Sequence, residues 1–267
     1  MTTPIRLLAL GDSFTEGVGD PDESRPNGVR GWADRTAEVL CNHDPSARYA
    51  NLAIRGRMLN RVMAEQIPAA LELKPSIVTL YAGANDILRP KVNLELILGN
   101  YRDHIEALRR AGIQVYLFTG FDPSTTATYA WMRPRVALYN ELVRDIAADL
   151  DCGIVDYWRL KHLQDWRFWG IDRMHMNANG HSVIAREVLR VIFGGIVTEA
   201  EISSHIPVAD PEPMAEIDRR AQIIANLQWT REHALPWIKR RLTGTSSGDG
   251  LSAKYPDWET FQARLAR

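Results

Sequence analysis

The feature of the sequence that most constrains its fold is a regular alternation of short, almost unbroken apolar runs with longer amphipathic runs. The short runs are apolar at consecutive positions, which indicates strands buried on both faces, as in a parallel sheet. They span Ile5–Leu10, Tyr49–Ala53, Ile77–Tyr81, Val115–Phe118 and Ile154–Val155. The amphipathic runs predict helices over Trp32–Leu40, Leu59–Leu73, Leu94–Arg110, Tyr129–Leu150 and Gly180–Phe193. Strands that alternate with helices predict an α/β protein, a three-layer α/β/α sandwich with a central, mostly parallel five-stranded sheet.

The composition excludes several other classes of protein. A net charge of -1 gives no overall attraction to nucleic acid or to anionic membranes. The two cysteines, Cys41 and Cys152, stand in no ligand motif, so neither a disulfide scaffold nor a zinc site is expected. No apolar run approaches the ~20 residues of a membrane span, and the first one is too short for a secretory signal. We therefore expect a cytoplasmic protein that binds no nucleic acid and does not insert stably into membranes.

The composition of the sequence changes at about Thr198, where a linker rich in proline and acidic residues begins. Two helical stretches, a Gly/Ser loop and an aromatic, charged end follow it. About 70 residues with few aliphatic side chains would make a thin core alone. We therefore predict a domain over residues 1–197 and an extension over residues 198–267 that packs on it.

The turn after the first strand, in the stretch "ALGDSFTEG", places a serine where ligands gather in a parallel sheet. Ser13 follows the strand directly, so a sharp turn would expose its hydroxyl and point backbone N–H groups at the same space. A phosphate loop and an ordinary tight turn are the alternatives. The glycines at positions 11, 17 and 19 match neither the dinucleotide-binding nor the P-loop pattern.

Polar or flexible residues recur at the ends of later strands. Gly56 lies on the loop after the second strand, and Asn85 follows the third. Asp172 stands three residues before His175, ahead of the last predicted helix. Since these strand ends meet at one edge of the sheet, the residues are expected to converge.

In this order, the segments "GDS", "RGR", "GAND" and "DRMH" resemble the four blocks of the SGNH hydrolases, also called the GDSL esterase/lipase family. The resemblance covers about the first 195 residues and implies a flavodoxin-like fold. Two positions depart from the family pattern: Phe14 stands where the first block has Leu, and Ala53 stands where the second has Gly. The extension is similar to those of actinobacterial members, which assigns it no function.

The resemblance and the residue chemistry together imply a catalytic triad. Ser13 is the expected nucleophile, His175 the base that takes its proton, and Asp172 the acid that orients the imidazole. His181 is the nearest competitor of His175, but it has no acid three residues before it and is assigned to packing. The expected oxyanion hole consists of the N–H groups of Ser13 and Gly56 and the side-chain amide of Asn85.

Several arginines flank these blocks, and they are candidates for binding an acidic group on a substrate. They are Arg55, Arg57, Arg89 and Arg173. The alternative is that these arginines are simply solvated at the surface, as most arginines are. In the extension, Trp229, Trp237 and Trp258 are expected to anchor it to the domain, with a cover over the acyl pocket as the alternative.

The function that these features predict is a serine hydrolase that cleaves carboxylic esters, or thioesters, through an acyl-enzyme intermediate. Its partner is a small acyl ester, and it needs no metal or organic cofactor. One alternative within the family is a deacetylase of acylated sugars. An alternative from another class is a ligand-binding α/β domain without catalysis. The patterns do not determine the acyl length, the alcohol part or the oligomeric state.

Overall fold

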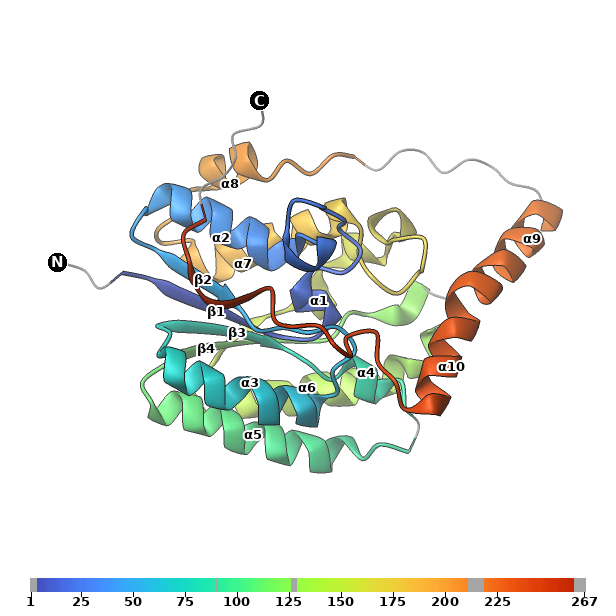
Figure 1. Cartoon of the computed structure of the whole chain (residues 1–267), viewed down its shortest axis with the longest axis horizontal. Coiled ribbons are helices and arrows are strands. Elements are labelled where there is room, and N and C mark those ends of the chain that lie inside the picture. The colour runs from blue at the N-terminus through green and yellow to red at the C-terminus, as the bar shows by residue number, and fades with distance from the viewer. Residues whose placement is uncertain (1–3, 90, 126–128, 211–218, 262–267) are drawn as a thin grey trace.

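The computed structural model of the chain has a six-stranded sheet between two layers of helices (Figure 1). It describes residues 4–89, 91–125, 129–210 and 219–261. The strands lie in the order β5-β4-β3-β1-β2-β6. Five of them are mutually parallel: β1 (Arg6–Gly11), β2 (Arg48–Asn51), β3 (Ile77–Tyr81), β4 (Gln114–Phe118) and β5 (Gly153–Val155). The predicted three-layer α/β architecture is confirmed.

The helices cover the two faces of this sheet. The long ones are α2 (Gly31–His43), α3 (Leu59–Leu73), α5 (Leu94–Arg110), α6 (Arg133–Asp149) and α7 (Ala178–Phe193). The short ones are α1 (Ser13–Glu16), α4 (Ala84–Ile87) and α8 (Glu199–His205). Figure 1 shows α2, α7 and α8 on one face of the sheet and α3, α5 and α6 on the other.

The central strand β1 explains why both faces are covered. Leu7 and Ala9 belong to the buried cluster under α2 and α7, whereas Leu8 and Leu10 belong to the cluster under α3, α5 and α6. Side chains alternate between the faces of a strand, so a run that is apolar at every position needs a helix layer on each side. The continuous hydrophobicity of Leu7–Leu10 therefore determines the layering.

The prediction of five strands is one strand short. β6 (Tyr255–Glu259), from the extension, pairs antiparallel with β2 and forms an edge of the sheet. Its sequence carries Pro256 and Asp257, both exposed, and proline and charge are tolerated in a strand at an edge. A strand with so few apolar residues gives no periodic signal in the sequence.

A helical arm of the extension stands at the end of the sheet where the parallel strands finish. It consists of α9 (Arg219–Trp229), a π-helical turn (Thr230–Ala234) and α10 (Leu235–Thr243). Figure 1 shows this helical arm beside α4, at the carboxyl ends of the strands. In the described ranges, no helix is both long and apolar enough to cross a membrane.

Candidate active site

The turn that carries Ser13 is shaped by the residues on either side of it. Gly11 ends β1 with φ +147°, and a Cβ there would lie 2.2 Å from the carbonyl oxygen of Tyr81. Asp12 caps the short helix α1, because its Oδ1 accepts from the N–H of Phe14 at 3.2 Å. Ser13 is the first residue of α1, so its hydroxyl emerges at the helix N-terminus beyond the end of the strand.

His175 and Asp172 meet this hydroxyl from the loop before α7. The Nε2 atom of His175 lies 3.0 Å from the Oγ atom of Ser13, and its Nδ1 atom lies 2.6 Å from Oδ2 of Asp172. The second carboxylate oxygen of Asp172 accepts from the backbone N–H groups of His175 and Met174, each at 3.0 Å. The three side chains form a continuous hydrogen-bonded chain. The structure brings together the residues that the sequence predicts as a triad.

The electrostatics of Asp172 suit a carboxylate that stays ionised. Partial burial raises the pKa of Asp172, but the hydrogen bond and charge of His175 and the two backbone N–H groups outweigh it and lower the pKa to about 2. The carboxylate is therefore charged over the pH range in which an imidazole titrates.

The three residues expected to supply the oxyanion hole line the same cavity. Ser13, Gly56 and Asn85 all line one large cavity, together with His175. Among the residues that the structure describes, neither the N–H of Ser13 nor that of Gly56 has a hydrogen-bond acceptor. The Nδ2 atom of Asn85 donates to the carbonyl of Arg57 at 3.1 Å and to Oδ2 of Asp12 at 3.3 Å, which hold the amide in place.

Gly56 is placed by its conformation and by the extension. Its φ is +76°, in the left-handed region that favours glycine, and a Cβ there would lie 2.1 Å from Oγ of Ser246. The hydroxyl of Ser246 in turn donates to the carbonyl of Arg55 at 3.4 Å. The loop that offers the Gly56 N–H is therefore in contact with residues nearly two hundred positions later in the chain.

Asp12 and His181, which lie close to the triad, belong to its buried support. Burial raises the pKa of Asp12 to about 7, against the opposing effects of the Phe14 N–H and of His175. Burial also lowers the pKa of His181 to about 4. His181 accepts from the N–H of Trp32 through Nδ1 and contacts the carbonyl of Val18 through Nε2. These contacts agree with the assignment of His181 to packing.

The comparisons with known proteins agree with this geometry. The model of the GDSL-like lipase/acylhydrolase family matches residues 9–183, which includes every segment of the site outside the extension. The chain belongs to this family. Membership confirms the predicted resemblance and supports the coarser prediction of an ester-cleaving hydrolase. A comparison with curated protein sequences finds no match.

Solved structures of several esterases share the fold of this GDSL-family protein. The acetylxylan esterase Axe2 from Geobacillus stearothermophilus aligns with a TM-score of 0.60 at 21% identity, over 74% of this chain and 100% of its own. The psychrotrophic esterase EstA from Pseudoalteromonas sp. aligns with a TM-score of 0.57 at 18% identity, over 71% and 97%. TesA aligns with a TM-score of 0.59 at 20% identity, over 71% and 98%. At these identities the likeness concerns the fold.

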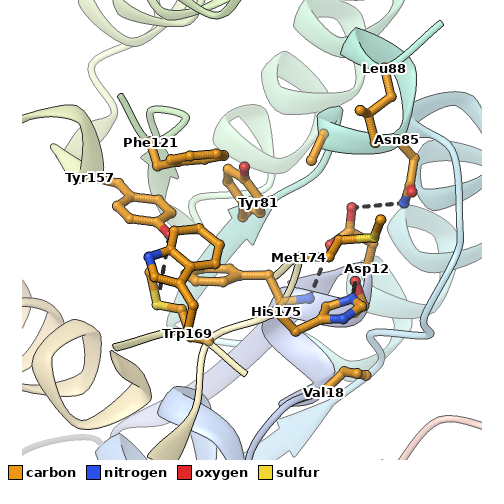
Figure 2. Close-up of a pocket in the computed structure, with 14 residues that line it drawn as sticks. Asp12, Val18, Tyr81, Asn85, Leu88, Phe121, Tyr157, Trp169, Met174 and His175 are labelled. Atoms are coloured by element: carbon orange, nitrogen blue, oxygen red, sulfur yellow. Dashed lines mark hydrogen bonds between the residues drawn. The ribbon is translucent and has the colours of Figure 1, made fainter. Parts of the chain in front are cut away.

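Two cavities of this GDSL-family protein meet at the triad. The smaller one has a volume of about 80 Å³ and lies beside Ser13, behind a wall of aromatic rings. Figure 2 shows the rings of Phe121, Tyr157 and Trp169 gathered at one end of it, away from His175 and Asn85. The rings of Phe121 and Trp169 are in contact, with centroids 4.9 Å apart. This pocket is small, and its walls are mostly apolar and aromatic.

The larger cavity has a volume of about 820 Å³ and lies between the catalytic residues and the extension. The lining residues that it shares with the small pocket are Ser13, Val18, Asn85, Leu88, Met174 and His175. Its far wall comes from the helical arm and the loop after it: Trp229, Glu232, His233, Ala234, Pro236, Arg240, Gly244, Thr245, Ser246 and Ser247. A ligand bonded to Ser13 therefore has two different spaces open to it.

The arginines proposed to bind substrate do not come together. Arg55 lines the large cavity, but its guanidinium forms an ion pair with the buried Glu16 at 2.8 Å. Arg57 is nearly buried, pairs with Glu65 at 2.8 Å and lines neither cavity. Arg173 lies over the ring of Trp229 and donates to Asn226, again outside both cavities. Arg57 and Arg173 thus make their contacts with other residues of the chain, and their assignment to substrate binding stays a prediction.

The aromatic wall of the small pocket is not predicted from the sequence, whereas the part played by Trp229 is. The aromatic wall includes Trp169, and the stretch "DWRFWG" just before Asp172 is the signal that could have indicated it. Trp229 both lines the large cavity and donates from Nε1 to the carbonyl of Asp172 at 3.0 Å, so it serves as anchor and wall. The side chain of Trp237 lies outside the described residues. In the described part of the chain, no group of three or more His, Cys, Asp or Glu is placed to hold a metal ion.

Proposed function

We propose that this protein is a serine hydrolase that cleaves esters of short carboxylic acids through an acyl-enzyme intermediate. The observation that carries the proposal is the chain of hydrogen bonds from Ser13 through His175 to Asp172, at 3.0 and 2.6 Å. A serine hydroxyl is inert at neutral pH unless a base accepts its proton during attack. His175 lies at hydrogen-bond distance from that proton.

In the proposed reaction, Oγ of Ser13 attacks the ester carbonyl and Nε2 of His175 takes the hydroxyl proton. The carbonyl oxygen becomes an oxyanion, which accepts from the N–H groups of Ser13 and Gly56 and from the Asn85 amide. His175 then gives the proton to the departing alcohol as the carbon–oxygen bond breaks. In the second half, His175 takes a proton from water, which attacks the carbonyl carbon of the acyl-enzyme. His175 then returns a proton to Oγ of Ser13 as the bond from that oxygen to the acyl group breaks, and the carboxylic acid is released. Asp172 stays ionised and offsets the imidazolium charge in both halves.

The donor geometry supports this order of events. The N–H groups of Ser13 and Gly56 have no acceptor among the described residues, so both are available to donate to a developing oxyanion. The bond from Asn85 to Asp12 is long, at 3.3 Å, so its amide proton can be redirected at small cost. One such donor contributes about 10²–10³ to turnover in a serine protease.

The small pocket supports a short acyl group. Its volume of about 80 Å³ is well below the roughly 150 Å³ of an apolar cavity that holds benzene. Its wall is mostly aromatic and aliphatic, and Asp12 and His175 are the acidic and basic side chains in it. An acetyl or slightly longer chain fits this space, whereas a long lipid chain would have to displace the rings.

A deacetylase of acylated sugars is the second candidate, since it would use the same residues. The volume and polar wall of the large cavity favour it, because the alcohol of a sugar ester is large and polar. The acetylxylan esterase Axe2 shares the fold, which is compatible with this activity without assigning it. A binding domain without catalysis would leave the triad geometry unexplained.

A screen of acyl length and alcohol tests the proposal. The p-nitrophenyl esters from acetyl to octanoyl, an acetyl thioester and acetylated xylooligosaccharides are assayed with the wild type and with Ser13→Ala as blank. We expect the highest kcat/KM for acetyl or propionyl esters and no activity above background in Ser13→Ala. Activity on the saccharides that exceeds that on p-nitrophenyl acetate would select the deacetylase. Equal rates for wild type and blank on every substrate would refute hydrolysis of these esters by Ser13.

A further inference from the structure

Two arginines on the wall of the large cavity form no ion pair. Arg89 follows Leu88, the C-cap of α4, and Arg240 lies in α10 of the extension; both are exposed. No carboxylate of the described ranges forms a salt bridge with either guanidinium. The charge of Arg89 acts to lower the pKa of Asp86, but Asp86 is buried and its Oδ2 accepts from the N–H of Leu59. The two positive charges are therefore available to a ligand.

The other charged groups on this wall are largely occupied. Arg55 pairs with Glu16, and Arg61 pairs with Glu65 at 2.6 Å. Asp172 is bonded to His175.

The remaining acid, Glu232, accepts from Nε2 of Gln228 at 3.1 Å on the helical arm. Its charge offsets that of one of the two unpaired arginines. Among the described residues, Arg89 and Arg240 are thus the cationic side chains of this wall that form no ion pair.

The two cavities indicate which way round an ester would bind at Ser13. If the acyl group fills the small pocket and its carbonyl carbon bonds to Ser13, the alcohol oxygen points into the large cavity. That space, about 820 Å³, is roomy enough for a sugar-sized alcohol. Arg89 comes from the catalytic domain and Arg240 from the extension, so an alcohol part in this space would lie between the two parts of the chain.

We propose that the large cavity binds the alcohol part of the ester and that Arg89 and Arg240 bind an anionic group on it. This inference rests on the proposed ester hydrolysis and adds the substrate class: short acyl esters of an alcohol that carries a carboxylate or phosphate. Guanidinium groups suit this role because they stay charged and offer paired N–H donors to such anions.

A matched pair of acetyl esters tests the inference. 4-Acetoxyphenylacetate carries an anion, whereas 4-acetoxyphenylacetamide is neutral and has a leaving group of nearly equal reactivity. We expect wild-type kcat/KM to favour the anion by about tenfold at low salt, since each exposed pair contributes a factor of about two to five. In Arg89→Gln/Arg240→Gln, the ratio should fall to about one. Added salt should lower the wild-type ratio.

Arg110→Gln is the control, because Arg110 is exposed on α5 and lines neither cavity. It should keep the wild-type ratio. Equal rates on both esters in wild type, or a ratio that survives the double substitution, would overturn the anion site and leave the proposed hydrolysis standing. Turnover of neither ester, nor of any p-nitrophenyl ester, would overturn both.

Discussion

Lys254 of the extension forms an ion pair with Asp34 of α2 at 2.8 Å, and both side chains are buried completely from solvent. The ammonium also donates to the carbonyls of Glu16, at 3.0 Å, and Arg30, at 2.8 Å. Glu16 is the last residue of α1, the helix that Ser13 begins. The extension is thereby joined to the element that holds the nucleophile.

Replacement of Lys254 should destabilise the whole protein. In Lys254→Met, the Asp34 carboxylate stays buried with hydroxyl partners only, from Tyr49 at 3.0 Å and Tyr255 at 3.4 Å. Removal of one partner of a buried pair typically costs about 3–5 kcal/mol. Urea unfolding at pH 8 measures the change. In Lys254→Met/Asp34→Asn, part of the lost unfolding free energy should be recovered, because no buried charge is left unpaired. A loss below about 0.5 kcal/mol in Lys254→Met would contradict the account.

Trp169 should limit the length of the acyl chain. Its ring closes the small pocket with Phe121, so Trp169→Ala lengthens the space available beyond the carbonyl. Each added methylene that becomes buried contributes about 0.8 kcal/mol. We expect the ratio of kcat/KM for hexanoyl over acetyl esters to rise at least about tenfold. Trp166→Ala, beside Trp169 but outside the pocket, should leave the ratio unchanged. An unaltered chain-length profile in Trp169→Ala would show that the acyl group lies elsewhere.

The turn at Ser13 could be predicted because its signals are local. The apolar run ends at Gly11, a capping aspartate follows, and a serine stands next; each is visible in a few residues. The triad followed from the strand-end rule and the family blocks, since Asp172 and His175 share one loop.

The role of the extension could not be predicted, because its contacts span the whole chain. Lys254 contacts Asp34, and Ser246 contacts the Gly56 loop. Both residues precede β6, whose exposed residues show no apolar periodicity. Likewise the guanidinium of Arg57 turns to Glu65 rather than to the cavity, a choice that the adjacent sequence does not reveal.

Asp12 should make stability fall as the pH rises. Burial raises its pKa from 3.8 to about 7, so between these values the native state binds a proton that the unfolded state has lost. This contribution is fully present below pH 4 and is lost as the pH passes 7. Its slope is on the order of 1 kcal/mol per pH unit. The unfolding free energy of Asp12→Asn minus that of wild type should therefore increase between pH 5 and pH 8. A difference independent of pH would contradict the burial effect.

Asp172 should be needed for turnover but not for binding. In Asp172→Asn the loop geometry can persist, while the negative charge that stabilises the imidazolium is gone. We expect kcat on an acetyl ester to fall by about 10²–10⁴-fold with a small change in KM. The pKa of about 2 predicts that wild-type activity shows no titration of this carboxylate above pH 4. A kcat within twofold of wild type would mean that the acid plays no catalytic part.

The central claim is that Ser13 is activated by His175, and covalent labelling with a fluorophosphonate tests it most directly. Mass spectrometry should find one adduct per chain, on Ser13, in the wild type and in Ser24→Ala, whose serine lies on an exposed loop. Ser13→Ala and His175→Ala should remain unlabelled under the same conditions. An adduct on another residue, or labelling of His175→Ala at the wild-type rate, would contradict the account.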